Sequence, residues 1–154
     1  MSGVEDNLKR LGIVLPTPSS PAANYVPTRR CGNQIYVSGQ VPNEGGKDKF
    51  TGKLGSTYSV EQGQAAARLC AINILAQLKQ ALNGDLSKVV GVIRLGGFVN
   101  AEPDFGDHPK VINGASDLMV EVFGEAGRHA RAAVGVYSLP RNVPVEVDAV
   151  FEVM

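Results

Sequence analysis

The sequence has little of several residues that mark particular classes of protein. Tryptophan is absent, aromatic residues make up 6% of the 154 residues, and there are two cysteines and two histidines. Two cysteines cannot form a disulfide framework in a chain of this length, and few aromatic side chains leave little on which nucleic-acid bases could stack. No apolar run approaches the roughly 20 residues of a membrane-spanning helix. We therefore expect a cytoplasmic protein with reduced thiols and no membrane contact.

Neither sign of charge is in excess. Lys and Arg number 15 and Asp and Glu number 15, so the net charge is zero. Phosphate backbones are bound through excess cationic charge, so nucleic acid is not an expected partner. Near-neutral proteins associate readily, and the length corresponds to one domain with one core. The first ten residues carry two acids before Lys9 and Arg10, unlike a secretion signal.

Hydrophobic periodicity predicts two main helices. The first opens at Ser59, whose spacing from Gln62 fits a capping box, and ends at Asn83-Gly84. The second begins around Pro109 and is closed by Gly124. Alternating or β-branched apolar stretches predict strands over 34–41, 86–100, 131–139 and 145–154. A short helix over 4–15, a proline-rich connector over 16–27 and a loop over 43–55 complete the prediction.

This order of elements predicts a two-layer α/β domain. A mixed β-sheet would carry both main helices on one face, and the last two strands, 131–139 and 145–154, would pair as a hairpin. The other face of the sheet would be bare and partly apolar, with Tyr36, Tyr137 and Val150 among its residues. A face of this kind is usually covered by a partner.

One pair of residues could carry chemistry on that bare face. Arg131 opens one of the last two strands and Glu146 lies on the other. If the valines at 134, 136, 145 and 147 pack under the helices, both charged side chains point to the bare face. An arginine there can clamp a carboxylate through two hydrogen bonds, and a glutamate can position a water or move a proton. The alternative is a cross-strand salt bridge with no ligand.

Other candidate motifs do not fit the chemistry they resemble. His108 and His129 lack further ligands at metal spacing, so we expect no metal site. Gly45-Gly46-Lys47 lacks the preceding glycine and the following Ser or Thr of a phosphate-binding loop. Ser38 lacks the flanking glycines of a nucleophile elbow.

Two stretches of the sequence are similar to the signatures of the RidA (YjgF) family. The first runs from Tyr25 through the turn Gly32-Asn33 to the strand Val37-Ser38-Gly39-Gln40-Val41-Pro42. The second runs from Arg131 through Leu139-Pro140 to Val145-Glu146-Val147-Asp148-Ala149. Together they span about residues 20–154, which leaves residues 1–20 as an N-terminal extension and 21–154 as a single RidA-like domain.

The resemblance implies a chorismate-mutase-like fold assembled as a homotrimer, with sheets inward, helices outward and three clefts between subunits. It implies hydrolysis of reactive enamines and imines, such as 2-aminoacrylate, to 2-keto acids and ammonia without a cofactor. The expected ligand is a small imino acid or keto acid. Imines hydrolyse readily in water, so orientation and carboxylate binding could supply most of the acceleration.

The same resemblance assigns roles to individual residues. Arg131 would bind the substrate carboxylate, and Glu146 would hold or activate the attacking water. Tyr25, Ser38 and Asn113 would line the cleft. The sequence departs from the family at Ala133, where a cysteine is common, and in a longer, more charged loop over 43–57. These departures indicate a longer subgroup and leave the substrate open.

Two other functions stay open on this sequence. One is a trimeric protein that binds small carboxylate metabolites without turnover. The other is an endoribonuclease, which is the family's older label. Zero net charge and the lack of a suitably placed histidine pair are arguments against the endoribonuclease.

Overall fold

The structure is a computed structural model that describes residues 3–21 and 23–154. Its ten helices and strands, in chain order, are α1 (Val4–Arg10), β1 (Thr28–Cys31), β2 (Gln34–Gln40), β3 (Asn43–Glu44), β4 (Lys47–Asp48), α2 (Val60–Ala81), β5 (Val89–Asn100), α3 (His108–Phe123), β6 (Ala130–Val136) and β7 (Val145–Val153). Short 3-10 turns lie over 86–88, 124–127 and 140–142. The two main helices and the four long strands predicted from the sequence are confirmed.

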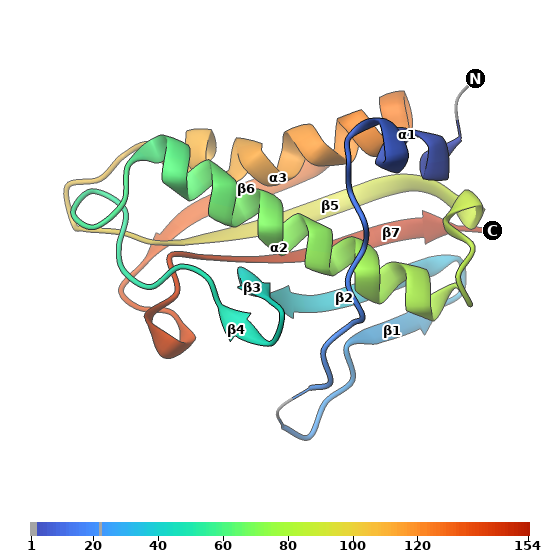
Figure 1. The fold of residues 1–154 in the computed structure, drawn as a ribbon, viewed down its shortest axis with the longest axis horizontal. Coiled ribbons are helices and arrows are strands. Elements are labelled where there is room, and N and C mark those ends of the chain that lie inside the picture. The colour runs from blue at the N-terminus through green and yellow to red at the C-terminus, as the bar shows by residue number, and fades with distance from the viewer. Residues whose placement is uncertain (1–2, 22) are drawn as a thin grey trace.

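Five strands form one mixed sheet in the order β1-β2-β7-β5-β6. β6 runs parallel to β5, and the other neighbours are antiparallel. Helices α2 and α3 lie side by side over one face, and α1 packs at the end of α3 (Figure 1). The predicted two-layer α/β arrangement with both main helices on one face is therefore confirmed.

The core lies between the helices and the sheet. The capping box predicted at the start of α2 is present, because Ser59 Oγ accepts from the Gln62 amide and Gln62 caps the Ser59 amide in return. Along β7 every second residue is buried, from Val145 to Val153. This alternation places one face of the sheet under the helices and leaves Glu146, Asp148 and Val150 on the other.

The predicted terminal hairpin is wrong. β7 pairs with β2 and β5, and β6 pairs with β5 alone, as the far edge strand of the sheet. The chain enters β6 from α3, and a helical crossover joins parallel strands. The short connection between β6 and β7 favours a hairpin, but β7 lies on the other side of β5 from β6, at the centre of the sheet.

The predicted orientation of β6 is also wrong. Val134 is 46% exposed on the bare face, whereas Ala133 packs against the core. Gly135 lies under the ring of His108, at the start of α3, where a Cβ would collide with that ring. Small residues therefore face the helix because α3 approaches β6 closely, and the large apolar side chain faces the open side.

The uncovered sheet face carries a mixture of apolar and charged side chains. Tyr36, which is 47% exposed, pairs with Val150, and Phe98 lies between Val134 and Glu146. Arg94 and Asp148 approach to 3.5 Å on the same face. Among the described residues, no helix is long and apolar enough to cross a membrane.

The two thiols differ sharply in accessibility. Cys31 is exposed at the end of β1, whereas Cys70 is buried in α2, and burial followed by the charge of Glu146 raises the pKa of its thiol well above the usual value. A thiol reagent acts on the thiolate, so we expect one fast-reacting thiol per native chain and two after unfolding in denaturant. Cys31→Ser should remove the fast phase. Rapid labelling of two thiols in the native protein would contradict this packing.

Candidate functional site

Arg131 lies between β6 and α3. Its position is opposite the buried Leu95, so its side chain points to the helix side of the sheet. Nη1 donates to Ser116 Oγ at 3.1 Å and Nη2 donates to the Pro109 carbonyl oxygen at 3.3 Å. The residue is exposed, so the guanidinium is fixed by α3 while part of it stays open to solvent.

We define the α3–β6 site by four residues: Asn113 and Ser116 on one face of α3, Arg131 on β6, and His129 just before β6. Pro109, Asn113 and Ser116 are spaced four and three apart and so share one side of the helix. His129 Nδ1 lies 2.6 Å from the Gly127 carbonyl oxygen, which accepts only if Nδ1 carries the proton. Nε2 then accepts from Ser116 Oγ at 2.9 Å. Ser116 is thus oriented by His129 and holds Arg131.

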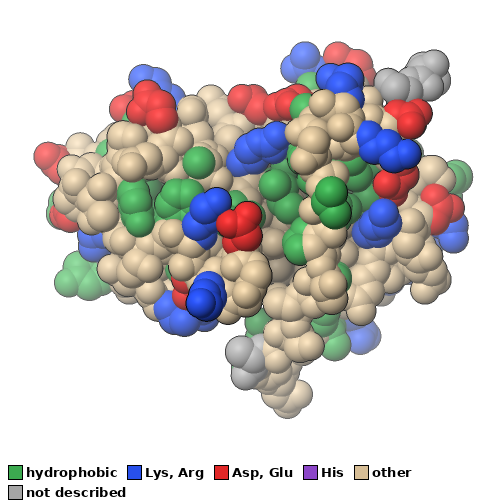
Figure 2. Space-filling view, in the orientation of Figure 1, with side chains coloured by type: hydrophobic (Ala, Val, Ile, Leu, Met, Phe, Trp, Pro, Cys, Tyr) green, Lys and Arg blue, Asp and Glu red, His purple; other side chains and the backbone are tan. Residues whose placement is uncertain are grey.

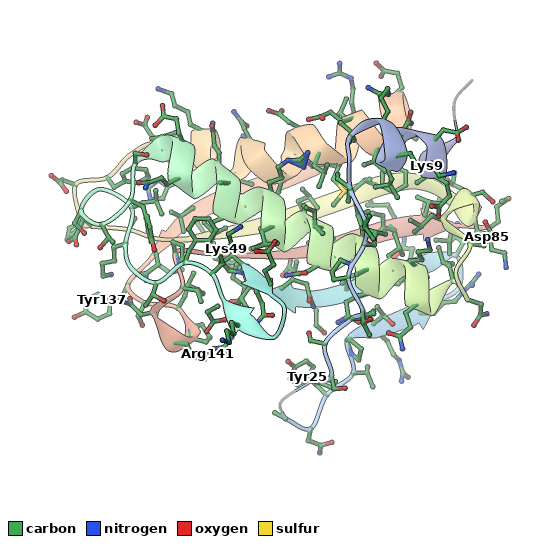
Figure 3. The ribbon with its side chains drawn as sticks, in the orientation of Figure 1. Lys9, Tyr25, Lys49, Asp85, Tyr137 and Arg141 are labelled. Carbon is green, nitrogen blue, oxygen red and sulfur yellow. The ribbon has the colours of Figure 1, made fainter. Side chains whose placement is uncertain are left out.

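A second group of polar residues lines a cavity of about 790 Å³ beside α2. The cavity, here called the Glu146 pocket, includes Tyr25, Gly39 and Glu146, and a second charged residue, Arg141. Figure 3 shows Tyr25 in the loop before β1 and Arg141 next to the β3–β4 hairpin, both on the side of the molecule away from α3. Gly39 leaves room for the Glu146 side chain, because a Cβ at this position would lie 2.6 Å from Glu146 Oε1.

Glu146 has an unusual electrostatic environment. It is half-buried, and burial followed by the nearby Asp148 raises its pKa, while Arg141 opposes the shift. Burial also raises the pKa of Asp148. A carboxyl group whose pKa is moved toward neutrality is better suited to take up and release a proton in a reaction near pH 7.

This environment predicts that Glu146→Gln stabilises the fold. When folding raises the pKa of a carboxyl group, the group stabilises the folded state most at a pH below its pKa in the unfolded chain. This contribution is lost as the pH rises through the pKa of the folded state. At pH 7 the amide should therefore raise Tm by about 1–4 °C, and the difference should vanish near pH 4. Calorimetry at both pH values, with exposed Glu121→Gln as control, measures this. A less stable variant at pH 7 would contradict it.

Arg141 was not singled out by sequence analysis. Its Nε and Nη2 donate to the two carboxylate oxygens of Asp48 at 2.6 and 3.0 Å, which lowers the pKa of Asp48. Its φ of 53° lies in the left-handed region, which is uncommon for a residue other than glycine. The only sequence signal was the turn after Leu139-Pro140, since the partner Asp48 lies in the loop expected over 43–55. The structure folds part of that loop into the β3–β4 hairpin.

The structure separates the predicted site residues into two groups. Arg131 and Asn113 lie at the β6 edge, on the helix side, and Tyr25 and Glu146 lie in the pocket near the β1–β2 edge. Within one chain, Arg131 and Glu146 therefore point to opposite faces, and the shared bare face expected for them is wrong. Ser38 donates to the Val26 carbonyl oxygen at 2.8 Å and so fixes the loop that carries Tyr25.

Fold and geometry together define a class: two-layer α/β proteins with an open sheet face and two separate groups of polar residues, one at the β6 edge and one around the central strand β7. The chain belongs to the family described as "YjgF/chorismate mutase-like, putative endoribonuclease", whose model matches residues 5–151. The family resemblance seen in the sequence is thereby confirmed.

Individual relatives extend this result. Protein TCP17 of Trypanosoma cruzi is 51% identical over 150 residues, covering 97% of this chain and 93% of TCP17. The crystal structure of Atu1372 from Agrobacterium tumefaciens, a protein of unknown function, is 55% identical with a TM-score of 0.92, covering 98% of this chain and 92% of that one. A 2-iminobutanoate/2-iminopropanoate deaminase of Dermatophagoides farinae is 25% identical over 138 residues, covering 90% of this chain and 92% of that one.

Proposed function

We propose that this protein hydrolyses reactive enamine and imine intermediates of the 2-aminoacrylate type to 2-keto acids and ammonia, in clefts between the subunits of a homotrimer. The observation that carries the proposal is the Arg131 guanidinium, which α3 holds at two points and leaves partly open. The relation to an imine deaminase supports it.

Assembly into a ring would complete the site. Arg131 lies at one edge of the sheet, and the loop with Tyr25 precedes the strand at the opposite edge. A head-to-tail interface between copies brings opposite edges together, and three copies related by a three-fold axis would close into a ring. The exposed Tyr36 and Val134 on the bare face would be covered in the same assembly. Arg131 of one subunit would then share a cleft with Glu146 of the next.

The chemistry follows from the groups present. Arg131 would hold the substrate carboxylate, which leaves the C=N bond oriented toward Glu146. The Glu146 carboxylate would take a proton from water as the water oxygen bonds to the carbon of the protonated imine, giving a neutral carbinolamine. Glu146 would then return this proton to the amino nitrogen, the C–N bond would break with its electron pair leaving on ammonia, and the hydroxyl proton would pass to solvent as the carbonyl of the keto acid forms. A raised pKa suits Glu146 for both transfers.

Hydrolysis is tested with an imino acid generated in the assay by an amino acid oxidase, with ammonia or keto acid followed against the spontaneous rate. Acceleration proportional to protein concentration supports the proposal, and an unchanged decay rate contradicts it. Binding of small carboxylates without turnover is the second candidate, since Arg131 alone suffices to bind an acid. Calorimetry with 2-oxobutyrate in the absence of acceleration would favour that role.

Ser116 is expected to position Arg131 for substrate binding. Ser116→Ala removes one of the two hydrogen bonds that hold the guanidinium, so KM should rise about 5-fold with little change in kcat. Ser116→Thr keeps the hydroxyl group and should restore KM. Steady-state kinetics of both variants measure this, and an unchanged KM for Ser116→Ala would contradict it.

A further inference from the structure

The Glu146 pocket is much larger than the smallest imino acids require. Its volume of about 790 Å³ falls in the range of about 300–1,000 Å³ typical of sites for drug-sized ligands. A three- or four-carbon acid would fill a small part of it. The connector over 16–21 forms one wall, and Figure 1 shows this segment crossing in front of α2 before the chain turns toward β1.

The pocket reaches from Glu146, which lies on the open face of the sheet, past the end of β2 to helix α2. Its α2 residues are Asn73, Ala76 and Gln77, and Gln77 lies under the connector. A ligand whose reacting carbon is near Glu146 can therefore reach Gln77 only with a long side chain.

Much of the pocket wall is rigid and apolar. The connector contributes three prolines, the loop before β1 contributes one, and the turn before β7 contributes one: Pro16, Pro18, Pro21, Pro27 and Pro140. Ala76 of α2 adds a further apolar surface. In Figure 2 hydrophobic side chains flank the connector where it crosses α2. Proline rings fix the backbone, so this wall is suited to a flat or bulky apolar group.

Two amide side chains in the pocket present acceptors. Asn73 Nδ2 donates to the Val41 and Asn43 carbonyl oxygens at 3.0 and 2.9 Å, and Gln77 Nε2 donates to the Ser19 carbonyl oxygen at 2.9 Å. Within residues 3–21 and 23–154, no donor reaches Asn73 Oδ1 or Gln77 Oε1. Gln77 is 3% exposed and lines the pocket. A ligand group that donates a hydrogen bond would satisfy these oxygens.

The charges in the pocket do not favour a second acid on the ligand. Arg141 is neutralised by its two hydrogen bonds to Asp48, and Glu146 would repel an additional carboxylate. The amide oxygens add to that repulsion because they are the negative ends of their dipoles.

We propose that the Glu146 pocket binds a 2-imino or 2-keto acid with a large, mainly apolar side chain that ends in a hydrogen-bond donor, such as a hydroxyl group. This inference rests on the proposed function for the location of the reacting end. The hydroxyl group would donate to the amide oxygens of Gln77 and Asn73, and the prolines would contact the apolar body.

The test compares stable keto acids as analogues of the imino acids by calorimetry on the full-length protein. 4-Hydroxyphenylpyruvate and phenylpyruvate differ by one hydroxyl group, and 2-oxobutyrate lacks the large side chain. We expect 4-hydroxyphenylpyruvate to bind about 10-fold more tightly than phenylpyruvate, because phenylpyruvate would displace water from these acceptors without replacing its hydrogen bonds. Phenylpyruvate should bind more tightly than 2-oxobutyrate. Equal affinities, tightest binding of 2-oxobutyrate, or binding of none of the three would overturn the proposal.

A matched pair of variants locates the effect. Gln77→Met keeps the shape of the side chain but removes its acceptor, and should abolish most of the preference for 4-hydroxyphenylpyruvate over phenylpyruvate. Gln80→Met, on the exposed side of the same helix, should keep the preference. The ratio of the two affinities is the readout, since a shifted connector would weaken both ligands. A ratio unchanged in Gln77→Met would exclude the assigned acceptor.

Hydrolysis measured on the matching imino acids separates this inference from the proposed function. Equal acceleration for small and aromatic imino acids would refute the pocket assignment and leave the hydrolase standing. Tight binding of 4-hydroxyphenylpyruvate without acceleration of any imine would refute the hydrolase and leave the pocket assignment standing.

Discussion

Replacing Arg131 by alanine is expected to lower kcat/KM for imine hydrolysis by about 100-fold or more. A guanidinium that binds a carboxylate through two charge-assisted hydrogen bonds contributes about 3 kcal/mol, and each 1.36 kcal/mol is a factor of ten. Keto-acid binding should be lost in parallel, because the same carboxylate contact is absent. Ammonia release and calorimetry on the variant measure the two effects.

Arg128→Ala is the matched control for this experiment. Arg128 lies three residues before Arg131 but is exposed and paired with Glu125 at 3.1 Å, on the outside of the fold. Its loss should leave kcat/KM within about twofold of wild type, as expected for a surface ion pair. Arg131→Lys should recover only part of the activity because an ammonium cannot form the two parallel bonds. An Arg131→Ala variant with wild-type activity would refute the role of this residue.

Mixing two inactive variants is expected to restore activity. Arg131→Ala lacks the carboxylate-binding group and Glu146→Gln lacks the proton-transfer group, so each homotrimer alone should be inactive. If every cleft takes Arg131 from one subunit and Glu146 from the next, random mixing of equal amounts restores about one quarter of the clefts. The two chains are unfolded together, refolded and assayed for ammonia release.

The same experiment discriminates between assemblies. Clefts that need both residues from one chain would give no activity above the separate variants, which would contradict a shared intersubunit site. Separately refolded variants that are combined without exchange provide the baseline. A particle of one chain in solution scattering would exclude the ring itself.

The elements of the fold were largely predictable because local signals and burial agree. The Ser59–Gln62 capping box marks where α2 begins, and the apolar stripe of α2 gives the helical period. The alternation along β7 gives the period of a strand. The pairing of β6 was not predictable in this way. A short connection favours a hairpin, and only the packing of α3 as a crossover moves β6 to the far side of β5.

The candidate site was partly predictable for the same reason. Arg131, Glu146, Tyr25 and Asn113 were found through motifs, but their arrangement depends on which face of β6 meets α3. A valine is more hydrophobic than an alanine or a glycine, so hydrophobic periodicity alone predicts that Val134 faces the helices. His108 packs closely on Gly135, so the opposite face of β6 from Val134 meets α3. Arg131 shares the face of Gly135 and therefore also points toward the helices.

Arg141 and the acceptors of the pocket could not be found from the sequence. Arg141 meets Asp48 across 93 residues, and Gln77 meets Ser19 across 58. Contacts of this length leave no periodic signal in the chain.

The sequence by itself determined the elements, the two-layer architecture and the family, because these depend on local propensity, hydrophobic period and short motifs. Only the tertiary structure decided which face each functional side chain occupies and which residues meet in the pocket. The physical reason is that a strand's orientation is set by how closely its neighbouring helix can pack, and this depends on the shapes of residues distant in the chain.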